Sequence, residues 1–232
     1  GAGSIYFLDA ADLTNNTFAC GTGTVYLNGS SAQTLTTNGQ SFYNVTLSNT
    51  VSTAVTVSGS MAVTGALTVG ANSTLDLAAN NVALSVTDAT VNNGTISGNT
   101  LNATPAAMTF SGAYSGTSGT LSATKGTTTF GANADLSSTT FTNNDGEVVF
   151  NGTTQTLTIG ANSKTFNSIA LNAATSFTLA DGANKLSADT LTDVGGSESI
   201  TLNAPVTVTK AVTFNTTGTV TLGNDGALTD VC

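Results

Sequence analysis

The chain has 232 residues and a formal net charge of −9, with an apolar fraction of 39% and a charged fraction of only 7%. It contains no His, no Trp and no Arg, which removes the usual residues for a Ser-His-Asp relay, an imidazole metal site and a bidentate phosphate clamp. We therefore expect a non-enzymatic protein without a cofactor, and the lack of a basic patch argues against nucleic-acid binding.

The first predicted strand is the apolar run at residues 4–8. The residues before it lack the basic and apolar regions of a signal peptide, so we expect that a leader was removed. No apolar run reaches the ~20 residues that a membrane-spanning helix needs. Cys20 follows this strand, and with Cys232 it permits one disulfide.

An internal repeat covers residues 3–77 and 126–222. Residues 3–29 align without a gap on residues 126–152, and residues 55–77 align without a gap on residues 200–222. The offset between the copies grows from 124 to 145 along the chain, so the second copy contains 21 additional residues. We interpret residues 1–232 as a single elongated domain.

The size of this insertion predicts the fold class. A sandwich or barrel rarely absorbs so many internal residues, whereas a solenoid can add a whole coil because each coil contacts only its neighbours. The predicted fold is therefore an all-β parallel solenoid with rungs of about 20–21 residues, and an offset near 123 would then be six rungs. A hexapeptide helix with rungs of about 18 residues is the alternative.

Within each rung the apolar residues come in pairs two positions apart, which places both side chains on one face of a short strand. Gly-, Ser- and Asn-rich segments between the pairs are typical of corners. Phe18, Phe42, Phe141 and Phe166 are expected inside the coil or under its corners. The side chains predicted to point inward are Val55, Val57, Val63, Leu67, Val69, Leu75, Leu77, Leu202, Val206, Val208, Val212, Phe214, Val220 and Leu222.

Three motifs of the first copy recur in the second: residues 23–29, 33–35 and 42–47 match residues 146–152, 155–157 and 166–171. In these motifs the chain resembles bacterial surface proteins with β-strand repeats, similar to the β-helical shafts of filamentous-haemagglutinin-like adhesins and autotransporter passengers. The resemblance implies a secreted, right-handed parallel β-helix used for adhesion or fibre building. It brings no catalytic or ligand-binding residues with it.

Two kinds of acidic site are considered and set aside. Asp-Gly steps at Asp145, Asp181 and Asp225 could bind calcium, but such steps are also ordinary turns and no Gly-Gly-x-Gly-x-Asp array accompanies them.

The second kind is a pair of carboxylates suited to glycoside hydrolysis, for which Asp9/Asp12 and Asp189/Asp193 are nearest in sequence. Without Arg, His or Trp to hold a sugar, we predict no catalytic residues.

The expected function is that of a structural subunit of an extracellular fibre or cell-surface filament, which associates with copies of itself head to tail. Strand edges without a capping element template the addition of another chain. Cys20 in the first rung and Cys232 in the last are then candidates for an inter-subunit disulfide. The alternatives are an adhesin shaft that binds a foreign receptor or glycan, and a binder of carbohydrate or ice.

Overall fold

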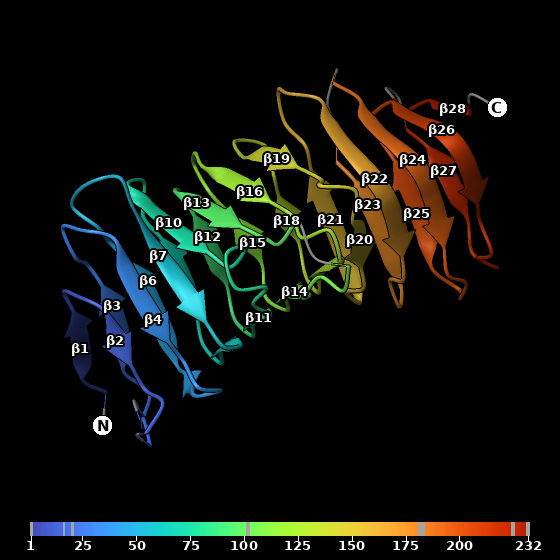
Figure 1. Cartoon of the computed structure of the whole chain (residues 1–232). Helices are drawn as coiled ribbons and strands as arrows, with labels where there is room; N and C mark the ends of the chain where they lie inside the picture. The colour runs from blue at the N-terminus through green and yellow to red at the C-terminus, as the bar shows by residue number, and fades with distance from the viewer. Residues whose placement is uncertain are drawn as a thin grey trace.

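The computed structural model describes residues 2–15, 17–19, 21–100, 103–180, 184–223 and 226–230. These residues form strands and turns without any helix, so none of them forms a helix that could span a membrane. Neighbouring turns pair their strands in parallel, and about ten turns stack into a β-solenoid (Figure 1). The predicted fold class is confirmed.

Three sheets run along the solenoid, and we call them A, B and C. Sheet A contains 11 strands: β1 (Ser4–Phe7), β3 (Thr24–Leu27), β6 (Asn44–Leu47), β9 (Leu67–Val69), β12 (Thr90–Asn92), β15 (Tyr114–Ser115), β18 (Ala134–Asp135), β21 (Thr154–Thr158), β23 (Ser176–Leu179), β25 (Ser199–Leu202) and β27 (Val220–Leu222). Sheet B contains seven: β2 (Ala11–Asp12), β4 (Gln33–Thr36), β7 (Thr53–Ser58), β10 (Ser73–Asp76), β13 (Thr95–Ser97), β16 (Thr120–Ser122) and β19 (Thr140–Thr142). Sheet C contains ten: β5 (Ser41–Phe42), β8 (Met61–Val63), β11 (Leu84–Val86), β14 (Met108–Phe110), β17 (Thr127–Phe130), β20 (Glu147–Phe150), β22 (Lys164–Leu171), β24 (Leu186–Asp193), β26 (Val206–Thr213) and β28 (Leu228–Asp230).

The length of one turn follows from the register between neighbouring strands. Thr24 pairs with Asn44, a step of 20 residues, whereas Thr95 pairs with Thr120, a step of 25 residues. The turns are therefore less regular than the predicted 20–21 residues. Corners absorb the difference, because they add residues outside the hydrogen-bonded ladder without changing the strands.

Sheet A shows how one column of side chains fills the interior. Ile5 pairs with Val25, and the same register continues strand by strand through ten steps to Leu222. The members between the two ends are buried, since each lies between a neighbour above and a neighbour below. Ile5 is 36% exposed and Leu222 is 51% exposed, because each has a neighbour in the column on one side only.

Most of the predicted core is confirmed. The ten predicted residues between Val55 and Val208 are buried, as are Phe42 and Phe166. The partly buried members Phe18, Phe141, Val212 and Phe214 pack against the core.

Two predicted core residues, Val220 and Leu222, are exposed instead, at 37% and 51%. Their strand, β27, ends sheet A, and no further strand of that sheet covers it among the residues that the structure describes. The alternation placed them on the inward face, but burial also requires a following turn.

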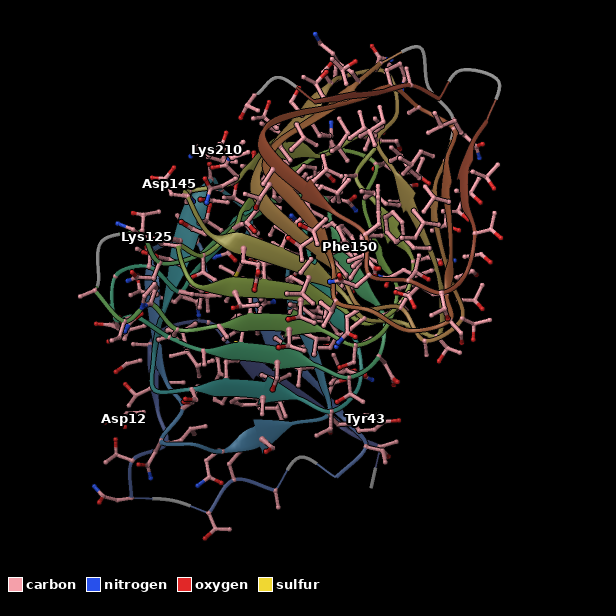
Figure 2. The ribbon with its side chains drawn as sticks, turned by 90° about the vertical axis from the view of Figure 1, so that its right-hand side faces the viewer. Asp12, Tyr43, Lys125, Asp145, Phe150 and Lys210 are labelled. Carbon is pink, nitrogen blue, oxygen red and sulfur yellow. The ribbon has the colours of Figure 1, made fainter. Side chains whose placement is uncertain are left out.

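Phenylalanine rings from successive strands stack on the inward face of sheet C. The ring centroids of Phe110 and Phe130 are 5.5 Å apart, and those of Phe130 and Phe150 are 5.6 Å apart, with interplanar angles of 21° and 15°. Figure 2 shows Phe150 inside the coil, with Lys125 and Lys210 at its outer border. The same residue type therefore stacks at the same position in successive turns, as expected of a solenoid.

Buried glutamines hold the corners of both repeat copies. The Oε1 atom of Gln155 accepts from the Gly152 N–H at 2.8 Å, while its Nε2 donates to the carbonyls of Phe130 and Ala132 at 2.9 and 2.6 Å. Gln33 makes the equivalent bonds in the first copy, to Gly29, Phe7 and Asp9. Each amide thus satisfies corner backbone groups that would otherwise be buried without partners.

The cross-section changes in the second half of the chain. Sheet B ends at β19, and the following strands of sheet C, β22, β24 and β26, are each eight residues long. The second half of β22 pairs with β20, whereas its first half lies beyond β19, where the Phe141 and Phe166 rings are 4.7 Å apart. The first halves of the long strands therefore occupy the position of sheet B, and one corner is replaced by a bend.

This change corrects the interpretation of the repeat as six rungs. The motif at residues 23–29 contains β3 of sheet A, whereas its counterpart at residues 146–152 contains β20 of sheet C. From β3 the chain makes five full turns to β18 and then passes through β19 to β20. The two copies are therefore related by five turns and two of the three faces, so equivalent residues lie on different sides of the solenoid.

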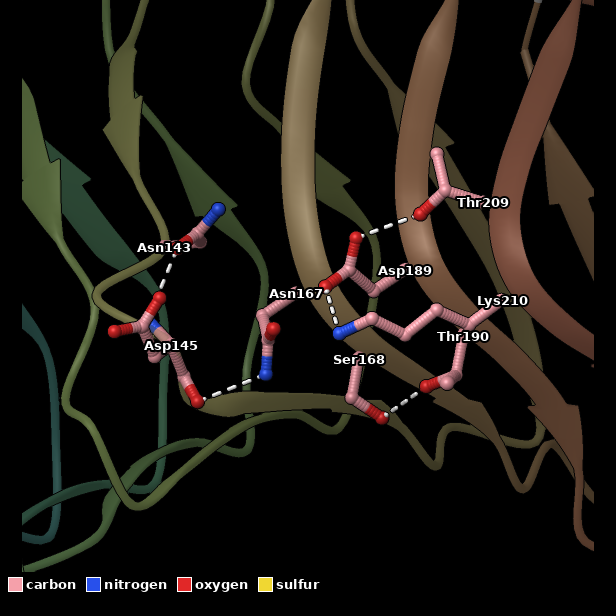
Figure 3. Close-up of polar contacts among 8 residues, drawn as sticks. All are labelled: Asn143, Asp145, Asn167, Ser168, Asp189, Thr190, Thr209 and Lys210. Atoms are coloured by element: carbon pink, nitrogen blue, oxygen red, sulfur yellow. Dashed lines mark hydrogen bonds and ion pairs between the residues drawn. The ribbon is translucent and has the colours of Figure 1, made fainter. Parts of the chain in front are cut away.

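The sequence explains locally why the corner between β8 and β9 of the first copy is absent from β26 of the second copy. A Cβ atom at Gly65, in the corner between β8 and β9, would lie 2.7 Å from the Tyr43 carbonyl oxygen, so this close approach requires glycine. Its repeat equivalent is Lys210, inside β26. There Thr209 and Lys210 form a β-bulge opposite Asp189, which accepts from Thr209 Oγ1 and Lys210 Nζ at 2.7 Å each (Figure 3).

Candidate functional site

The described Asp-Gly step, at Asp145, forms a turn. Asp145 has φ of 61°, and its N–H donates to Asn143 Oδ1 at 3.0 Å while its carbonyl accepts from Asn167 Nδ2 at 2.9 Å (Figure 3). Asp181 and Asp225 lie outside the described residues. Among the residues that the structure describes, no three His, Cys, Asp or Glu side chains gather as a metal site would require.

Three carboxylates of the considered acid pairs, those of Asp12, Asp189 and Asp193, have separate partners. Asp12 accepts from the Thr14 hydroxyl and N–H, and these two bonds lower the pKa of Asp12. The hydrogen bond from Lys210, followed by that from Thr209, lowers the pKa of Asp189. Asp193 is instead paired with Glu198, so Asp189 and Asp193 do not share a partner.

Asp193 and Glu198 form a buried acid pair at the corner between β24 and β25. Although burial opposes it, hydrogen bonds from Glu198 and from the backbone lower the pKa of Asp193, and those backbone bonds include Gly195 at 3.2 Å and Asn215 at 2.8 Å. The hydrogen bond to Asp193, and then burial, raise the pKa of Glu198, which is 1% exposed. Asp193 is thus the member of the pair that loses its proton first as the pH rises, and Glu198 keeps its proton to higher pH.

Sequence reasoning missed this pair, although a signal for Glu198 was present. Ile200 faces inward, so the alternation of its strand extended two residues back reaches Glu198 on the same face. A carboxyl in that position needs a partner, which no sequence pattern names.

The acid pair is the first candidate site, and the two ends of sheet A form the second. β1 and β27 are its end strands, and each has a hydrogen-bonded neighbour on one side only. The exposed apolar side chains at these ends include Ile5 and Leu8 near β1, and Val220 and Leu222 on β27. An open ladder lined with uncovered apolar side chains can pair with a further strand.

A groove between β19 and β22 is the third candidate site. It has a volume of about 280 Å³ and lies between two successive turns, where sheet B ends. The residues that line it are Ser138, Thr139, Thr140, Phe141, Asn162, Ser163 and Lys164. Lys164 is only 4% exposed, and burial lowers its pKa.

The groove was also missed from the sequence. In β22 Lys164 lies two residues before the buried Phe166, so both side chains lie on the inward face of the strand. An inward lysine in a strand was therefore visible in the sequence, but the missing ladder between β19 and β22 was not.

The cysteines of the predicted disulfide, Cys20 and Cys232, both lie outside the described residues. An inter-subunit bond between them stays a prediction.

Comparisons of this chain with protein-family models, with curated proteins and with solved structures found no match, so its function has to be inferred from the fold and from these three sites.

Proposed function

We propose that the chain is a non-enzymatic structural subunit of an extracellular fibre or cell-surface filament, and that it associates end to end with copies of itself. The observation that carries this proposal is that β1 and β27 are the two open edges of one parallel sheet. The extracellular location rests on the sequence resemblance alone.

The two edges are complementary in direction and in chemistry. In a parallel sheet one edge of the last strand can pair with the opposite edge of the first. A junction that keeps the register of sheet A would place Leu222 of one copy against Ile5 of the next, which continues the apolar column by one step. Fully burying an aliphatic side chain stabilises by roughly 1.5–3 kcal/mol, so these half-exposed residues supply a few kcal/mol per junction.

The symmetry of the junction favours a polymer. A contact between two different ends is heterologous, and such contacts produce open filaments unless the rotation between subunits closes a ring. A second contact would join the remaining faces, where Leu228 of β28 approaches Ala11 of β2. Ala11 is buried in the core, and Leu228 is partly buried and packs against it.

The proposal is tested with a charge placed on either face of β27. Leu222→Asp puts a carboxylate in the junction, whereas Thr221→Asp puts the same charge on the outward face of the same strand. Electron microscopy and sedimentation of the 232-residue chain should show filaments for the parent and for Thr221→Asp, and single rods for Leu222→Asp. Filaments of undiminished length from Leu222→Asp would refute the junction.

The predicted disulfide supplies an independent measurement. If Cys20 and Cys232 meet across the junction, non-reducing gels of the filament should show a ladder of covalent multimers that reductant or Cys232→Ser collapses. Disulfides persist in secreted proteins, so this outcome also fits the proposed location. A bond between the two cysteines of one chain would argue against an extended rod.

The alternative is an adhesin shaft that binds a foreign receptor or glycan. The groove beside Lys164 favours it, because an adhesin needs a ligand site and an end-to-end polymer does not. Single rods that bind a ligand without forming filaments would support the adhesin and exclude the polymer.

A further inference from the structure

The starting point is an uncompensated charge. Lys164 is 4% exposed, and burial lowers its pKa with no contribution from a neighbouring carboxylate. In the described part of the chain the one ion pair joins Lys210 to Asp189, on the outer surface. A lysine side chain that is largely buried without a carboxylate partner is costly, and it is unexpected in a chain with 13 acidic residues.

The surroundings of this charge are polar and open to a ligand. Besides Phe141, the groove is lined by hydroxyl and amide side chains, and Lys164 is its single titratable residue. Since β19 ends sheet B, one row of its backbone N–H and C=O groups also has no strand partner on the groove side. A volume of about 280 Å³ is many times that of a water molecule and is near the lower end for small-ligand sites.

We propose that this groove binds an acidic sugar, whose carboxylate pairs with the ammonium of Lys164. The sugar hydroxyls exchange hydrogen bonds with Ser138, Thr140 and Asn162, which supply both donors and acceptors. Phe141 provides an apolar surface for one face of the ring. This site is independent of the end-to-end junction.

The composition of the groove decides among anionic ligands. A phosphate carries about two charges and is usually held by several cations or by arginine, whereas the groove contains one lysine. An apolar carboxylate would leave the hydroxyl and amide groups without partners. A singly charged ligand rich in hydroxyls satisfies both the ammonium and the walls.

The test measures binding of D-glucuronate, D-glucose and acetate by nuclear magnetic resonance titration. Lys164→Met keeps the side-chain volume and removes the charge, and replacing a buried charge by an apolar group of similar size usually preserves the fold. Lys125→Met, on the exposed outer surface, is the matched control. The parent should bind glucuronate more tightly than glucose or acetate, with shifted resonances at residues 138–141 and 162–164.

The expected loss for Lys164→Met is at least about tenfold in glucuronate affinity, as for removal of a charge-assisted hydrogen bond. Lys125→Met should stay within about twofold of the parent. Asn162→Ala should weaken glucuronate but leave acetate unchanged, because only the sugar uses the wall. Glucuronate affinity should also decrease as the pH rises through the lowered pKa of Lys164, since the ammonium is then lost.

Any of four results would overturn the proposal. The first is no glucuronate binding to the folded parent, and the second is equal affinity for glucose and glucuronate. The third is Lys164→Met binding that matches the parent. Acetate binding as tightly as glucuronate would reduce the site to a simple carboxylate site and refute the sugar.

Discussion

At the scale of single residues, the interior columns hold the solenoid together. Leu67 lies between Val45 and Thr90 in the column of sheet A and is fully buried. Truncating such a side chain removes its transfer free energy and leaves a cavity that the stiff ladder cannot close.

We therefore predict that Leu67→Ala lowers the free energy of unfolding by about 2–5 kcal/mol. Thr68→Ala, on the outward face of the same strand, should change it by less than about 0.5 kcal/mol. Urea titration followed by circular dichroism measures both. A change below about 0.5 kcal/mol for Leu67→Ala would mean that the faces of β9 are inverted.

Which residues face inward was largely predictable from the sequence, because alternation in a strand assigns every second side chain to one face. The burial of a polar group was not predictable in the same way. Lys164 and Glu198 have the inward phase of Phe166 and Ile200, yet their surroundings depend on neighbouring turns some twenty residues away. Alternation assigns the face of a residue but not its partner.

At the scale of elements, corners decide how the strands are joined. Gly65 lies in a sharp corner where an added Cβ would contact Asn44 Oδ1 and lie 2.7 Å from the Tyr43 carbonyl oxygen. Its repeat equivalent Lys210 lies in a bulge with a 67% exposed side chain.

Gly65→Ala should accordingly lower the free energy of unfolding by about 1–3 kcal/mol, because the methyl group overpacks a rigid corner. Lys210→Ala should cost less than about 1 kcal/mol, since it removes only an exposed ion pair. Thermal unfolding of the two variants in parallel tests this difference. Equal costs would show that the corner and the bulge impose the same constraint.

The acid pair makes one corner dependent on pH. The raised pKa of Glu198 means that its contribution to stability is complete below its unfolded-state pKa and is lost as the pH rises through the folded-state value. The lowered pKa of Asp193 has the opposite sign, and its contribution is lost as the pH falls through the folded-state value. The corner between β24 and β25 is therefore most stable between the two folded-state pKa values.

We predict that raising the pH above the folded-state pKa of Glu198 increases amide hydrogen exchange, corrected for its intrinsic pH dependence, at Gly195 and Asn215, which donate to Asp193. Glu198→Gln keeps a donor toward Asp193 and cannot ionise, so the same amides should stay protected across that range. If the parent and Glu198→Gln show the same pH profile, no proton is shared between the two carboxyl groups.

At the scale of the whole molecule, net charge opposes the proposed assembly. Each copy carries −9, and like-charged rods repel one another over distances that salt reduces. The apolar junction itself depends little on moderate salt.

Filament length should therefore increase as the ionic strength rises from about 10 mM to about 150 mM, over which the Debye length falls from about 30 Å to about 8 Å. Light scattering at fixed protein concentration measures this increase. Leu222→Asp should remain short at every salt concentration, which separates specific growth from general aggregation. Filaments that dissolve as salt is added would indicate a junction held by ion pairs.

The solenoid itself was predictable because an insertion of one whole turn left the register of the repeat intact. The relation between the copies was not, because spacing in sequence does not reveal how many corners make a turn. Residues 33–36 and 154–158 share the motif around Gln33 and Gln155, yet β4 belongs to sheet B and β21 to sheet A. Assigning a motif to a face requires the three-dimensional register.

The additional residues of the second copy show that the length of the rod can change without a change in the direction of side chains around its axis. Before the insertion the copies are five turns and two faces apart, and after it β7 and β25 are six turns and two faces apart. One complete turn thus lengthens the rod by about 4.8 Å without rotating anything that follows. Gain of a fraction of a turn would instead swing every later side chain around the axis. Related proteins can therefore differ in rod length by whole turns while every surface group keeps its orientation about the solenoid axis.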